Sequence, residues 1–170
     1  MKQIKDIKNK IAWEKCYDPT FEWINYNFYR NNKLSEDFIR EFKDKVDWEH
    51  ISYYQKLSED FIREFKDKVD WGFISNYKTL SEDFIREFQD KVNWDNISIS
   101  LKLSEEFIEE FRDKVNWRYI SKYQTLSEDF IRKFKNRVDW DMIFAYQTLS
   151  KEFKKEFKKN CIFYEAAEKY

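Results

Sequence analysis

The sequence has almost none of the residues that make tight turns: among 170 residues there is one glycine, Gly72, and one proline, Pro19. A fold with many β-hairpins needs such residues at its turns, so helices joined by short capped connections are expected instead. A single glycine also argues against the glycine-rich loops that cradle phosphate groups.

Long apolar runs, a charge excess and a cysteine framework are also missing. No apolar run approaches the roughly 18 residues that cross a membrane, and no apolar segment of a secretory signal follows the lysine-rich residues 1–10. The net charge is −1, from 32 basic and 33 acidic residues, so a nucleic-acid partner is not expected. Cys16 and Cys161 lie near opposite ends, which predicts reduced thiols and an intracellular protein.

Aromatic residues are abundant, at 21% of the chain, and include 7 tryptophans, 11 tyrosines and 17 phenylalanines. Hydrophobic residues make up 42% and charged residues 38%, a composition typical of a globular protein. A chain of this length can bury a sizeable core.

A 23-residue repeat organises this aromatic content. A segment that begins Leu-Ser recurs with its leucine at positions 34, 57, 80, 103, 126 and 149. The spacing predicts one continuous domain: N-terminal capping helices over 1–33, five complete repeats over 34–148, and a degenerate sixth repeat with a C-terminal cap over 149–170.

Each copy of the repeat predicts two helices. Ser35 is a favoured N-cap, and acidic residues follow it in the first turn, so a helix is expected over 35–46. Asp47, or Asn in its place in other copies, is a second N-cap that predicts a short helix over 48–55. The apolar spacing is helical, and no copy has the strand pattern of a leucine-rich repeat. The predicted fold is all-α, an α-solenoid of two-helix repeats.

The residues before the first copy predict capping helices. Asp18-Pro19 resembles an N-cap followed by proline at the first helical position, so a helix is expected from about Thr20 to Asn31. The lysine-rich start, up to Tyr17, predicts another. Such caps cover the terminal faces of a repeat array.

No residue pattern indicates catalysis, a metal site or a cofactor. His50 is the only histidine, and it has no acidic or thiol partner at a useful spacing. Four repeated serines could be nucleophiles but are expected to be small residues that allow close helix approach: Ser52, Ser75, Ser98 and Ser121. The sequence therefore predicts a protein that is not an enzyme.

Three positions of the second helix in each copy vary most, and they lie opposite the Trp/Ile side of that helix. Solenoids commonly bind partners through variable surface positions on a constant framework. Large apolar or aromatic side chains at several of them are typical of interfaces, whereas drift at a solvent-facing surface should give mostly polar ones. The candidate partner-binding residues are His50, Tyr53, Phe73, Asn76, Asn96, Ile99, Arg118, Tyr119, Lys122 and Met142.

An arginine row offers a second candidate site. One repeat position holds Arg40, Arg63, Arg86 and Arg132, and Glu109 interrupts the row. Such a row could bind phosphates. The alternative is a salt-bridged surface, because an acidic residue lies four positions before each arginine and four positions after three of the four.

The repeat LSEDFIREFKDKVDWxxISxYQ, as in residues 34–55, resembles a repeat of uncharacterised proteins from giant DNA viruses of amoebae and from some bacteriophages. The resemblance covers roughly residues 34–157. It implies an intracellular viral or phage protein, in the host cytoplasm if viral, that acts on a host factor. It carries no shared activity and no functional residues.

Three functions remain open at this stage. The first is a non-enzymatic scaffold that binds a host protein through the variable helix face, without a cofactor, nucleic acid or membrane. The second is a small-molecule binder that sequesters a nucleotide signal between aromatic rings and the arginine row. The third is a self-assembling structural protein.

Overall fold

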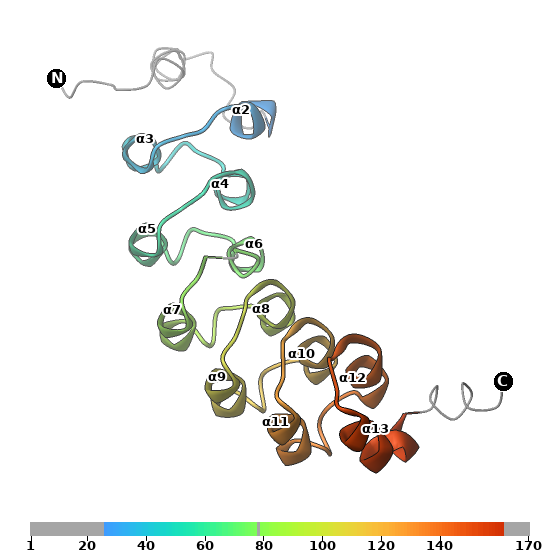
Figure 1. Cartoon of the computed structure of the whole chain (residues 1–170). Coiled ribbons are helices and arrows are strands. Elements are labelled where there is room, and N and C mark those ends of the chain that lie inside the picture. Colours follow the sequence, from blue (N-terminus) through green and yellow to red (C-terminus); the bar gives the residue numbers. More distant parts are fainter. Residues whose placement is uncertain (1–25, 78, 162–170) are drawn as a thin grey trace. The chain divides into compact units, whose positions relative to one another are not determined.

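A computed structural model describes residues 26–77 and 79–161, and within these residues the ordered elements are helices, with no strand. The described chain confirms an all-α fold of regularly repeating helices, consistent with an α-solenoid. It divides into two compact units, residues 1–74 and residues 75–170, each of which is described by itself. The described helices of each unit form two rows (Figure 1).

The first unit contains five described helices. They are α2 (Tyr26–Asn31), α3 (Glu36–Glu41), α4 (Trp48–Tyr54), α5 (Glu59–Glu64) and α6 (Trp71–Ile74). Helix α4 packs between α2 and α6, and α3 and α5 lie in the other row (Figure 1).

The second unit repeats this arrangement. Its helices are α7 (Glu82–Glu87), α8 (Trp94–Ser100), α9 (Glu105–Glu110), α10 (Trp117–Tyr123), α11 (Glu128–Lys133), α12 (Trp140–Tyr146), α13 (Lys151–Phe157) and the short 3₁₀-helix η1 (Lys158–Asn160). Helix α10 packs between α8 and α12. We call α4, α6, α8, α10 and α12 the tryptophan helices, and α3, α5, α7, α9, α11 and α13 the serine-capped helices.

The predicted N-caps are present in both kinds of helix. The Ser35 hydroxyl accepts a hydrogen bond from the Phe38 backbone N–H, and its counterparts in later copies do the same at 3.1–3.2 Å. The Asp47 carboxylate accepts from the His50 N–H at 3.1 Å, which starts α4. These caps satisfy N–H groups that have no partner within the helix, and so they set where each helix begins.

The serine-capped helices are shorter than the sequence predicts. A helix was expected over 35–46, but α3 ends at Glu41, with Phe42 as its C-cap. Beyond Phe42 the backbone tightens, because the Lys45 N–H donates to the Phe42 carbonyl at 2.8 Å. The Trp48 indole N–H donates to the Lys43 carbonyl at 2.9 Å, so the side chain that opens the next helix stabilises this turn. The turn still buries Val46, at 7% exposure.

Aromatic stacking joins successive copies. The phenylalanine and isoleucine of α3, α5, α7, α9 and α11, such as Phe107 and Ile108, are buried. Trp94 is half-buried and lies against the next copy, with its ring centroid 4.9 Å from that of Phe111. Trp117 repeats this contact with Phe134 at 5.0 Å. Each copy therefore completes the core of its neighbour, as nearest-neighbour packing in a repeat array requires.

A glutamine side chain closes three of the copies, and it is buried at Gln55 and Gln124 and half-buried at Gln147. The Gln124 side chain accepts a hydrogen bond from the Leu103 N–H at 3.0 Å and donates to the Ser98 and Leu101 carbonyls. Gln55 and Gln147 make the same set of three bonds around their own neighbours. The side-chain amide thus supplies hydrogen-bond partners for backbone N–H and carbonyl groups in the connection between helices.

The terminal predictions are only partly covered by the described residues. Of the helix expected from Thr20 to Asn31, the part over Tyr26–Asn31 is observed as α2. The remaining N-terminal predictions, including Cys16 and the helix up to Tyr17, lie outside the described residues, as do residues 162–170. The Cys161 thiol is buried and donates a hydrogen bond to the Asp141 carboxylate at 3.4 Å.

Candidate binding surface

Exposed apolar side chains gather on one kind of helix. Within the described ranges the exposed large hydrophobic residues are Tyr53, Ile99, Tyr123 and Tyr146, with exposures of 57%, 37%, 48% and 56%. All four lie on tryptophan helices, namely α4, α8, α10 and α12. The serine-capped helices expose mainly charged residues instead. Within each unit, the tryptophan helices therefore form a candidate binding surface.

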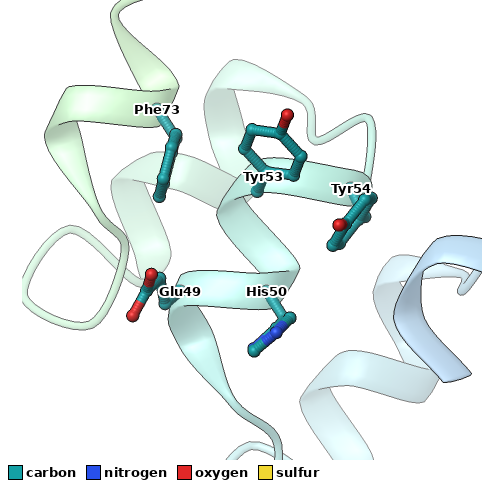
Figure 2. Close-up of a pocket in the computed structure, with 5 residues that line it drawn as sticks. All are labelled: Glu49, His50, Tyr53, Tyr54 and Phe73. Carbon is teal, nitrogen blue, oxygen red and sulfur yellow. The ribbon is translucent and has the colours of Figure 1, made fainter. Parts of the chain in front are cut away.

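In the first unit this surface contains a pocket of about 200 Å³ between α4 and α6. It is lined by Glu49, His50, Tyr53, Tyr54 and Phe73. Figure 2 shows Phe73 reaching from α6 toward Tyr53, with Glu49 and His50 one turn earlier on α4. The Tyr53 and Phe73 rings meet edge to face, with centroids 4.9 Å apart.

His50 forms one wall of this pocket and is fixed by its neighbours. Its ring stacks on Tyr29 at 5.4 Å and on Tyr54 at 6.1 Å. Its Nδ1 lies 3.1 Å from the Asp47 carboxylate. Burial raises the pKa of Asp47, but hydrogen bonds and charge at His50 outweigh it, so the pKa lies below its usual value. The imidazole therefore supports the start of α4 as well as the pocket.

The candidate residues around α8 lie at or near the surface. Ile99 is exposed on α8, and Asn96 is half-buried near the start of the same helix. Asn76 is exposed, and its side-chain oxygen accepts a hydrogen bond from the Ser100 hydroxyl at 3.2 Å. This part of the surface is more polar than the pocket on α4.

On α10 and α12 the candidate residues surround a lysine. The Lys122 Nζ lies over the rings of Tyr123 and Tyr146, at 4.9 Å and 5.0 Å from their centroids. Tyr119 is half-buried, with its ring 6.2 Å from that of Tyr123. Arg118 is exposed and pairs with Asp139 at 3.4 Å. Met142 is half-buried on α12.

Sequence reasoning missed the tyrosines that end the tryptophan helices. Position 54 and its counterparts are not among the candidate partner-binding residues, yet Tyr123 and Tyr146 are about half exposed. A signal was present, because four of the five copies hold tyrosine at this position and none holds a purely apolar residue. A tyrosine hydroxyl prefers a polar environment, so a repeated tyrosine indicates the edge of a core.

The arginines of this row form ion pairs with carboxylates. The Arg40 guanidinium pairs with Glu36, Asp37 and, at 2.7 Å, with Glu64 of the next copy. It also lies over the Phe61 ring at 5.0 Å. Arg86 and Arg132 repeat these contacts, and Arg63 pairs with two acids of its own helix. These contacts favour a salt-bridged surface over a phosphate site.

The repeated serines have a structural role that the sequence did not suggest. The Ser98 side chain is fully buried, donates to the Trp94 carbonyl at 2.7 Å and accepts from the Asn116 N–H at 3.1 Å. Ser52 and Ser121 make both bonds in the same way. In the first copy the Tyr29 hydroxyl takes this place and accepts from the Asp47 N–H. These serines therefore link successive copies and are closed to a substrate.

Over the described ranges, no group of three or more His, Cys, Asp or Glu side chains is placed to hold a metal ion. Residues 26–77 and 79–161 also include no helix long and apolar enough to span a membrane.

Comparisons with known proteins give no match to the chain. No protein-family model matches it, and neither a curated protein nor a solved structure is significantly similar to it. The function of the chain is therefore inferred from its own surface.

Proposed function

We propose that the chain is a non-enzymatic scaffold that binds a protein partner through its tryptophan helices. The observation that carries this proposal is the placement of Tyr53, Ile99, Tyr123 and Tyr146, which are exposed although similar side chains elsewhere pack in the core. Exposed tyrosines on a rigid helix contribute large contact area at low entropic cost, which suits an interface.

The proposal extends to the identity of the partner. The resemblance of the repeat to proteins of giant DNA viruses and bacteriophages favours a host protein, met inside the host cell. The constant framework supports a role in recognition. The buried serines, the glutamines and the stacked rings hold the fold, while the surface positions vary between copies.

The nucleotide-sequestering alternative has less support. The arginines that would hold its phosphate are paired with carboxylates, as shown for Arg40 and Arg86. The pocket on α4 is also smaller than the roughly 300–1,000 Å³ typical of sites for drug-sized ligands.

Quantitative affinity capture from host lysate tests the scaffold proposal. The bait variant Tyr53→Ser, Ile99→Ser, Lys122→Ser changes only the tryptophan helices at positions outside the core. We expect a stoichiometric partner of the native chain to be depleted at least about 10-fold, since truncating interface anchors costs on the order of 1–2 kcal/mol each.

The matched control replaces three exposed lysines away from those helices: Lys45→Ser, Lys56→Ser and Lys102→Ser. It should retain the partner. Equal loss from both variants, or equal retention by both, would rule out the tryptophan helices as the interface. Light scattering of the purified chain at increasing concentration separates a scaffold from a self-assembling protein, whose particles would grow.

A further inference from the structure

The pocket on α4 combines aromatic rings with an unpaired carboxylate. Glu49 lines the pocket, is exposed, and has no lysine or arginine of the described residues within ion-pair distance. Most glutamates of the serine-capped helices, by contrast, form ion pairs, as Glu64 does with Arg40. The pocket therefore presents a negative charge that the described chain does not neutralise.

The ring arrangement around Glu49 suits a cation. Tyr53, Tyr54 and Phe73 supply three rings, and Tyr53 meets each of the other two edge to face, at 4.6 Å and 4.9 Å. The face of an aromatic ring carries negative potential and attracts an ammonium or guanidinium group within about 6 Å of its centre. A carboxylate beside such rings adds charge complementarity and disfavours an anion.

The chain makes this type of contact itself in its second unit. Lys122 occupies on α10 the position that Tyr53 occupies on α4, and its ammonium lies over two tyrosine rings. Tyr123, one of the two, is the counterpart of Tyr54. In the first unit the described lining of the pocket contains no lysine or arginine, which leaves the rings and the carboxylate available to a cation from a partner.

The size of the pocket limits the occupant. At about 200 Å³ it accommodates a single side chain and is small for a nucleotide or another drug-sized ligand. We propose that this pocket binds a lysine or arginine side chain of the protein partner, an inference that rests on the proposed function. Glu49 would be the charge partner, and the rings of Tyr53 and Phe73 would form the walls.

NMR titration of the full chain with single blocked amino acids tests this proposal. The probes are Nα-acetyl-arginine amide and Nα-acetyl-lysine amide, and the neutral analogues are the citrulline and Nε-acetyl-lysine forms. We expect saturable shifts of the backbone amide signals of residues 49–54 and 73 with at least one cation. The neutral forms should bind at least about 10-fold more weakly.

Variants locate the contact. Glu49→Gln and the double variant Tyr53→Ala, Phe73→Ala should each weaken binding of the cation by about 5-fold or more. The matched control is Asp95→Asn, which changes the exposed position of α8 equivalent to Glu49 and should leave binding of the cation unchanged. Circular dichroism verifies that each variant keeps its helices.

Equal binding of cations and neutral analogues would overturn the proposal, as would the absence of saturation at tens of millimolar. Lysate capture with Glu49→Gln then separates the two levels of the argument. If Glu49→Gln retains a partner that the tryptophan-helix variant loses, the scaffold function stands and the cation pocket fails. Loss of the partner from both supports both.

Discussion

At the scale of single residues, the buried serine hydroxyls show how a small polar group can link one copy to the next. The Ser98 hydroxyl bonds to the carbonyl of its own helix and to the N–H that opens the following helix. Sequence reasoning recognised that this position is small and repeated, but it could not identify the bond. The partner N–H lies 18 residues away, and its position depends on how the copies stack.

Replacing this hydroxyl should destabilise the fold. Ser98→Ala leaves the Asn116 N–H without its acceptor, and a buried unsatisfied donor costs about 1–3 kcal/mol. We expect urea unfolding to show a loss within this range. Ser100→Ala, which removes an exposed hydroxyl from the same helix, should change stability by less than about 0.5 kcal/mol. Equal losses would show that the buried bond contributes nothing specific.

At the scale of elements, the sequence predicted where helices begin much better than where they end. The side chains of Ser35 and Asp47 are favoured N-caps that mark where their helices begin, and both caps are observed. The end of α3 depends on the Trp48 indole, which bonds back to the turn from the next helix. Since a helical apolar pattern continues through Val46, periodicity alone could not reveal this early end.

A charge reversal between two neighbouring copies also belongs to this scale. Arg40 and Arg86 each pair with a glutamate of the next copy, but Glu109 stands in the arginine row. Its counterpart across the copies is Lys133, whose Nζ lies 2.6 Å from the Glu109 carboxylate. The sequence showed Glu109 as a break in the row, whereas the structure shows a pair with its signs exchanged.

Exchanging the signs back should restore the common arrangement. We expect Glu109→Arg and Lys133→Glu each to destabilise the chain, because each places like charges together. The double variant should recover most of the loss. A double-mutant cycle in urea should give a coupling energy of about 0.5–1 kcal/mol that shrinks in 1 M NaCl, as for exposed pairs. Additive losses would mean that the pair is not coupled.

At the scale of the whole molecule, the copies are not all stabilised by the same hydrogen bonds. Gln55, Gln124 and Gln147 close their copies with side-chain amide bonds, but the third copy has Leu101 at this position. Leu101 is buried and fills the space without supplying an acceptor. The Leu80 N–H, which such a glutamine would bind, instead donates to the Tyr77 carbonyl at 3.4 Å. Repeat arrays sum local stabilities, so this difference should remain local.

Amide hydrogen exchange should reveal this difference in local stability between the copies. The amides of Leu103 and Leu126 donate hydrogen bonds to Gln124 and Gln147. The Leu80 amide should exchange at least about 5-fold faster than these two, because one buried hydrogen bond adds on the order of 1 kcal/mol to the free energy of local opening. Leu101→Gln should slow exchange at Leu80, and Gln124→Leu should speed it at Leu103. If Leu80 is already as protected as Leu103 in the native chain, the glutamine bonds do not set local stability, and stacking of the aromatic rings alone holds the copies together.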